Sequence, residues 1–179
     1  MAKPYTINIV NGQGQESVVN GSYQVEANVV GYDNTTLTPT SVTVDGTATT
    51  YNFTIAATGT LTLHVTEDGT TTGTPVVGAT FNRTDAQGNI YGNVITTDSN
   101  GDAVFNNVPF AETGAPIIYY KQISSDGNHN FDNTVKNTTL TTSTETIQIE
   151  NSLPTTQTFN LTDANYEGLT IGSGTITLS

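Results

Sequence analysis

Histidine, cysteine and paired carboxylates are the side chains that most often carry acid–base or nucleophilic chemistry. This sequence has two histidines, His64 and His129, and no cysteine, which excludes thiol nucleophiles and thiolate metal sites. Neither histidine lies in a recognisable catalytic triad or set of metal ligands. His64 falls on the polar face of an expected strand and His129 in a loop. Both are therefore expected to face solvent.

Glu112 is a carboxylate in a loop flanked by Gly and Pro. Glycoside hydrolysis needs two carboxylates at a set separation, and no partner for Glu112 can be argued from the sequence. We therefore predict no catalytic residue and no enzymatic activity.

Two segments place oxygen-bearing side chains at every second residue, as part of a calcium loop does. In the first segment, Asp98, Asn100 and Asp102 lack the remaining ligands and the closing Glu of an EF-hand, so a structural turn is favoured over weak Ca²⁺ binding. The second segment, in a Gly-containing loop, consists of Asp126, Asn128, Asn130 and Asp132. A solvated loop is favoured there over a cation site or a receptor-facing surface. No cofactor is expected.

The composition excludes several classes of partner. The 179 residues carry four Lys+Arg against sixteen Asp+Glu, a net charge of -12 that cannot neutralise phosphates. Nucleic acid and anionic membranes are therefore excluded as partners. The N-terminal residues contain no apolar segment of the kind found in signal peptides. No apolar run approaches the roughly 20 residues of a membrane span.

Short alternating runs rich in Val, Ile, Thr and aromatic residues predict about a dozen β-strands and no helix. Asp-Gly and Asn-Gly pairs separate many of them, as hairpins require. The strands are expected at residues 5–10, 22–30, 42–44, 51–55, 60–65, 76–81, 90–95, 103–108, 117–123, 146–149, 158–161 and 175–178. This pattern favours an all-β protein built of antiparallel β-sandwiches.

An internal similarity suggests two tandem domains. The segments 42–46, 49–55 and 58–63 resemble, in the same order, the segments 147–151, 155–161 and 173–178. We predict two Ig-like or prealbumin-like sandwiches, a short domain at residues 1–57 and a longer one at 58–179 with an extra C-terminal strand.

Residues 59–151 carry a family signature. Gly59-Thr-Leu-Thr-Leu is followed by Thr74-Pro-Val-Val-Gly-Ala-Thr-Phe, and then by Thr97-Asp-Ser-Asn-Gly-Asp-Ala-Val-Phe-Asn-Asn-Val-Pro; Thr146-Ile-Gln-Ile-Glu-Asn closes the segment. This half of the chain resembles the Cna-B/SpaA-type domain of bacterial adhesins and pilins, a prealbumin-like β-sandwich.

The resemblance implies a cross-link that this sequence lacks the residue to form. Domains of that family often contain a Lys–Asn isopeptide bond catalysed by a buried acid. Asn151 matches the Asn and Glu112 the acid, but Val65 stands where the Lys is expected. We therefore predict no isopeptide bond at this site.

The C-terminal residues Gly174, Thr175, Ile176, Thr177 and Leu178 form the last expected strand. One interpretation is that this strand completes the second sandwich. The other is that it pairs with an edge strand of a neighbouring subunit and so drives assembly.

These observations favour a non-enzymatic structural or adhesive module of an extracellular assembly. A phage virion protein (capsid decoration, fibre or tail component) is the leading hypothesis, because the N-terminus shows no export signal. A module of a bacterial surface adhesin or pilin is the alternative, and a carbohydrate-binding module is a second alternative. The expected partners are copies of itself or other structural proteins, with host-surface glycans or proteins as further candidates. The expected location is a virion surface or a bacterial cell surface.

Overall fold

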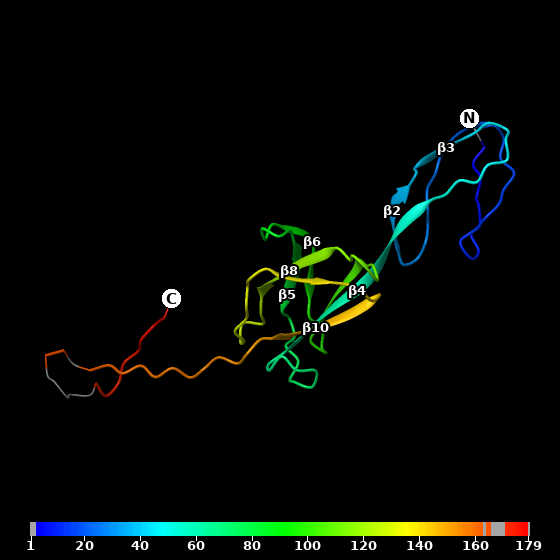
Figure 1. Ribbon diagram of the computed structural model, residues 1–179. Helices are drawn as coiled ribbons and strands as arrows, with labels where there is room; N and C mark the ends of the chain where they lie inside the picture. The colour runs from blue at the N-terminus through cyan, green and yellow to red at the C-terminus, as the bar shows by residue number, and fades with distance from the viewer. Residues whose placement is uncertain (1–2, 163, 166–170, 179) are drawn as a thin grey trace.

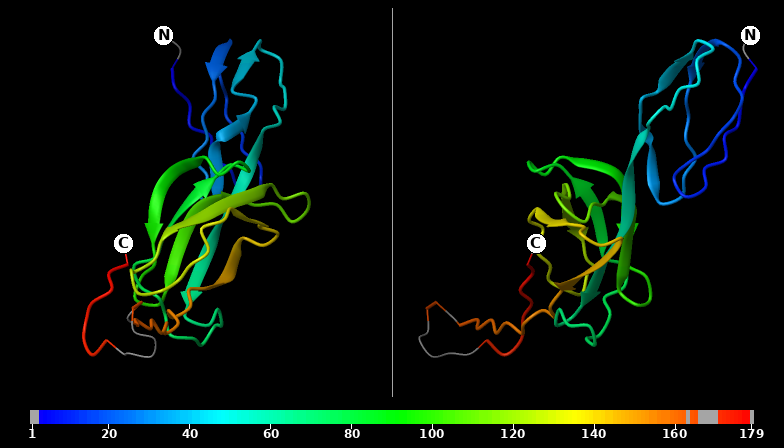
Figure 2. Two further views of the ribbon diagram at one scale, coloured as in Figure 1. Left: turned by 90° about the vertical axis from the view of Figure 1, so that its left-hand side faces the viewer. Right: turned by 45° about the vertical axis from the view of Figure 1, so that its right-hand side comes forward.

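The computed structural model describes residues 3–162, 164–165 and 171–178 (Figure 1). Ten β-strands occur in this part of the chain, and it contains no helix that is long and apolar enough to cross a bilayer. Three parts follow one another: an N-terminal lobe, a β-sandwich and an extended C-terminal tail. The lobe and the tail leave the sandwich at opposite ends (Figures 1 and 2).

The sandwich is made of two sheets. In the first, β4 (Thr54–Thr66) pairs with β10 (Thr144–Glu150), with β7 (Asp102–Pro109) and with β2 (Tyr32–Thr38). The second has the order β6 (Ile90–Thr96), β5 (Thr80–Thr84), β8 (Ile117–Ser124) and β9 (Lys136–Thr139). The expected all-β sandwich is therefore confirmed.

The hydrophobic core lies between these two sheets. Alternation along β4 turns Leu61, Leu63 and Val65 inward, and all three are completely buried. Phe81 of β5 and Ile118 of β8 meet them from the other sheet. The pattern of alternating apolar residues thus selects which face of each strand packs inside the sandwich.

One pair among the strands of the described residues is parallel. Residues Thr144–Glu150 of β10 run in the same direction as Thr60–Thr66 of β4, in an unbroken register of seven pairs. All the other strand pairs are antiparallel. β4 therefore lies in the middle of its sheet, with β10 on one side and β7 on the other.

The expected domain boundary between residues 57 and 58 falls inside β4. The start of this strand pairs with β2 of the N-terminal lobe, through Ala57 and Ala56. The rest pairs with β7 from Thr58 onward and with β10 from Thr60 onward. A single continuous strand therefore connects the lobe to the sandwich.

The N-terminal lobe has little buried apolar surface. Its two-stranded sheet joins β1 (Gly21–Gln24) to β3 (Ser41–Val44), and Tyr5 stacks edge-on against Tyr23 with ring centroids 5.8 Å apart. Among the described residues of the lobe, Leu37 is the one buried hydrophobic side chain, whereas Ile9 and Val30 are 62% and 96% exposed. The lobe is thus an open β-structure rather than a closed sandwich with a core of its own.

Several expected strands differ from those observed. Residues 5–10 form only an isolated bridge between Val10 and Gln13, and the run at 22–30 contributes the shorter β1. The run expected at 76–81 is displaced to β5. The sequence did not predict β2 or β9, which are polar strands that lie beside β4 and β8.

The described residues of the tail lie outside the two sheets of the sandwich. Apart from an isolated bridge residue at Thr162, the described residues from 151 to 178 form no β-structure, so the strands expected at 158–161 and 175–178 are wrong for this chain on its own. Ile176 and Leu178 are 52% and 73% exposed. The alternating sequence is present there, but no neighbouring strand supplies the hydrogen-bond partners that a strand requires.

Candidate binding groove

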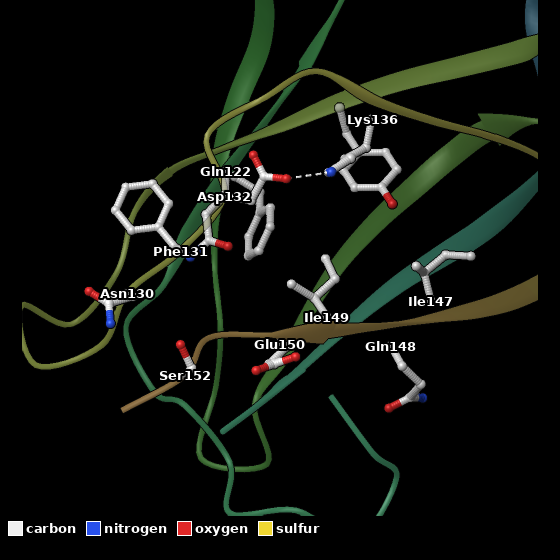
Figure 3. A pocket seen from close by; sticks show the side chains of 12 residues that line it. Gln122, Asn130, Phe131, Asp132, Lys136, Ile147, Gln148, Ile149, Glu150 and Ser152 are labelled. Carbon is white, nitrogen blue, oxygen red and sulfur yellow. Dashed lines mark hydrogen bonds and ion pairs between the residues drawn. The ribbon is translucent and has the colours of Figure 1, made fainter. Parts of the chain in front are cut away.

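A groove of about 520 Å³ opens at the side of the sandwich, between β10 and the chain that leads into β9 (Figure 3). Ile147 and Ile149 point from β10 toward the side on which Phe131, Asp132 and Lys136 lie, whereas Gln148 points the other way. The remaining lining residues are Phe81, Tyr120, Gln122, Asn130, Glu150 and Ser152. The lining thus combines apolar side chains with polar and charged ones.

Edge strands border the groove. β10 is the last strand of its sheet and pairs with β4 alone, and β9 is the last strand of the other sheet and pairs with β8 alone. Edge strands present unpaired N–H and C=O groups that accept an added strand.

Two of the three charged side chains that line the groove pair with each other. Lys136 donates a hydrogen bond to Asp132, and this bond together with the backbone N–H of Thr134 lowers the pKa of Asp132 from 3.8 to about 2. Burial raises the pKa of the Tyr120 phenol, which also lines the groove. Asp132 and Lys136 thus form an ion pair at the edge of the groove.

In the turn at residues 98–102, backbone N–H groups of the turn itself donate hydrogen bonds to the carboxylate of Asp98. Oδ1 of Asp98 accepts the N–H of Asn100 at 2.8 Å and that of Asp102 at 3.0 Å, and these bonds lower the pKa of Asp98. Gly101 has a φ of 80° and lies so close to β4 that a Cβ atom would stand 2.4 Å from the carbonyl oxygen of Val65. The segment is therefore a turn that packs on β4.

The loop around Asp126 is organised in the same way. Oδ1 of Asp126 accepts the N–H of Asn128 at 2.9 Å and lies 2.9 Å from Nδ1 of His129. Asn130 turns instead toward the start of the tail, and Asp132 toward Lys136. No group of three His, Cys, Asp or Glu side chains that could hold a metal ion occurs among the described residues.

The expectation that both histidines face solvent is wrong. Nδ1 of His64 lies 2.7 Å from Oδ1 of Asp102, and the His64 side chain is 17% exposed. The His129 side chain is 11% exposed and contacts carboxylates through both ring nitrogens. The Asp126–His129 spacing of three residues is visible in the sequence, but the second partner, Glu67, is 62 residues away.

The structure does not bring Glu112 and Asn151 together. Asn151 is fully buried at one end of β4, where its backbone N–H donates to the carbonyl of Thr66 at 2.9 Å. Glu112 follows β7 at the other end of β4, where Pro109 pairs with Thr58. At about 3.3 Å per residue, the eight steps from Thr58 to Thr66 span roughly 26 Å.

The position that matches the lysine holds a core side chain. Val65 is fully buried and pairs with Ile149 of β10, two residues before Asn151. Nδ2 of Asn151 donates to Oγ of Ser125 at 3.1 Å, whereas its Oδ1 is buried without a hydrogen-bond partner. The absence of an isopeptide bond here stays a prediction.

No family model matches the sequence, and no curated protein matches it. Solved structures similar to this chain include the TIE protein of Bacillus anthracis (19% identity, 57% of this chain, 19% of that chain, TM-score 0.43). The major pilin subunit BcpA of Bacillus cereus is similar at 16% identity over 57% of this chain and 32% of that chain, with a TM-score of 0.45. The minor pilin GBS52 of Streptococcus agalactiae is similar at 19% identity over 85% of this chain and 69% of that chain, with a TM-score of 0.48. The chain thus spans a third or less of the first two proteins.

Proposed function

We propose that this protein is a non-enzymatic structural or adhesive module of an extracellular assembly. Two observations carry the proposal. A groove lies beside the edge strand β10, and the apolar side chains in the described part of the tail belong to no strand. Both favour contact with another chain over chemistry on a small substrate.

The partner proposed is the tail of a second copy, added as a strand at the free edge of β10. Gly174-Thr-Ile-Thr-Leu differs from Gly59-Thr-Leu-Thr-Leu of β4 at one position, and residues 60–63 of β4 already pair with β10 along its other edge. The described residues 171–178 carry no charged side chain, so their approach adds little repulsion to a chain of net charge -12.

Substitutions in the tail test this assembly. We expect wild-type chains to associate with rising concentration in analytical ultracentrifugation. Ile176→Asp should abolish association, because the carboxylate would be buried against Ile147 and Ile149. Thr177→Asp is the matched control, since it adds the same charge on the opposite face of the strand and should retain association. A chain that stays monomeric at every concentration, or equal association of the two variants, would contradict the proposal.

Deletion of residues 169–179, which begins outside the described residues, separates the two interpretations of the tail. A folded, monomeric truncated chain supports a role in assembly. Loss of folding supports a strand that belongs to the sandwich of its own chain.

The bacterial cell surface is the proposed location, and the virion surface is the second candidate. The sequence motifs of residues 59–151 resemble domains of bacterial surface proteins, and no feature of the described residues favours a virion. Immunogold labelling of cells and of purified phage particles tests this location. Label on the cell envelope supports the proposal, and label confined to phage particles contradicts it.

A further inference from the structure

The imidazole of His129 links its own loop to a segment that is distant in the sequence. Its Nδ1 lies 2.9 Å from Oδ1 of Asp126 in the same loop, and its Nε2 lies 3.3 Å from Oε1 of Glu67, directly after β4. The next residue, Asn130, donates its backbone N–H to the carbonyl of Ser152 at 2.9 Å. His129 thus joins the loop to the end of β4, and Asn130 joins it to the start of the tail.

The number of protons on the ring decides whether both contacts hold. An ionised carboxylate only accepts hydrogen bonds, and a neutral imidazole has a single N–H. A neutral His129 would therefore direct the lone pair of one nitrogen at a negatively charged oxygen. The protonated ring donates from both nitrogens and satisfies Asp126 and Glu67 together.

We propose that His129 is a proton-operated latch. In its protonated form it fastens the loop of residues 125–130 to the end of β4, and it thereby holds Asn130 at the start of the tail. Loss of the proton releases the Glu67 contact first, because Asp126 belongs to the same loop and is held by the N–H of Asn128.

The charged groups around His129 favour the protonated form. Asp126 is its first partner and Glu67 its second, and both raise its pKa above the ordinary value of 6.5. Two further carboxylates lie at the same end of β4 as Glu67. Asp68 accepts from the hydroxyl groups of Thr66 and Thr70, and Glu150 lies against Gly69. Farther along the loop, Asp132 is neutralised by Lys136.

The sign of the pH dependence follows from the raised pKa. Stability from the latch is fully present below pH 6.5 and is lost as the pH rises through the higher pKa of the folded state. Asn130 and Phe131 line the groove, so release of the latch also loosens one wall of that groove. The latch acts within one chain and does not depend on the assembly proposed above.

Histidine titration by NMR on the full chain tests the first step. We expect the pKa of His129 to lie above 6.5 and to fall toward 6.5 in Glu67→Gln, which keeps the shape of the side chain and removes its charge. Glu145→Gln, a substitution on β10 with no contact to His129, should leave the titration unchanged. A His129 pKa at or below 6.5, or one that Glu67→Gln does not lower, would overturn the latch.

Hydrogen exchange at the backbone amide of Asn130 tests whether deprotonation of His129 loosens the hydrogen bond from Asn130 to Ser152. After correction for intrinsic exchange, we expect protection to fall roughly two- to fivefold between pH 5.5 and pH 8.5, the scale of a part-exposed ion pair. His129→Gln and Glu67→Gln should both show the lower protection at either pH. Protection that is independent of pH in the wild-type chain would overturn the proposal.

Discussion

Nδ1 of His64 and Oδ1 of Asp102 lie 2.7 Å apart and join β4 to β7 at a register pair of the sheet. Asp102 also donates its backbone N–H to Asp98, which closes the turn before β7. The half-buried pair therefore fixes the position of this turn against the middle strand of the sandwich.

Replacement of Asp102 by Asn should lower the free energy of unfolding by about 0.5–1 kcal/mol, since the pair is only partly exposed. Urea denaturation measures the change. Asp132→Asn removes an ion pair whose two side chains are about half exposed and should have a smaller effect. Equal losses in the two variants would show that burial does not strengthen the His64 contact.

Replacement of Leu63 by Ala should lower the free energy of unfolding by about 2–5 kcal/mol, because it removes a completely buried side chain from the core. Val104→Ala is the control, since Val104 lies on β7 and is 37% exposed. Denaturation of both variants checks the difference. Similar losses would contradict the placement of the core on the inner face of β4.

Acid should destabilise the protein as the pH falls below 4. The pKa values of Asp126 and Asp132 are lowered from 3.8 to about 2 by hydrogen bonds from His129 and Lys136 respectively. A carboxyl with a lowered pKa stabilises the fold above its unfolded pKa, and this contribution disappears as the pH falls through the folded pKa.

Urea midpoints measured from pH 5 down to pH 2 follow this loss. The double variant Asp126→Asn, Asp132→Asn should have a flatter profile than the wild-type chain. An unchanged profile would mean that other groups carry the acid sensitivity.

Intact mass spectrometry should give the mass of the sequence with no loss of ammonia. Val65 fills the position where the Lys is expected, and Glu112 lies at the opposite end of β4 from Asn151. A mass lower by about 17 Da would reveal an internal cross-link and contradict the prediction.

The sequence predicts those strands whose apolar residues alternate. Leu61, Leu63 and Val65 mark β4 because burial of one face imposes a period of two. β2 and β9 were missed because Thr, Asn and Asp dominate them, and their strand conformation comes from pairing with β4 and β8. The tail shows the reverse case, since its alternating residues 174–178 pair with no strand in the part of the chain that the structure describes.

The groove and the latch could not be predicted from spacing alone. Phe131 and Ile147 come together only once β10 lies beside the loop that precedes β9. Glu67 reaches His129 only because β4 ends next to that loop. Contacts of this kind depend on the path of the chain between elements, and no local pattern encodes that path.

The parallel pairing of β4 with β10 determines how the sandwich would carry a mechanical load. The N-terminal lobe enters at the start of β4, and the tail leaves from the end of β10, at the opposite pole (Figure 1). A pull on these two ends slides the two strands past each other along their length. The hydrogen bonds that join Thr60–Thr66 to Thr144–Glu150 are then strained together rather than one after another. Force along this axis therefore loads the hydrogen bonds between β4 and β10 in shear, and it does not break them one at a time from one end.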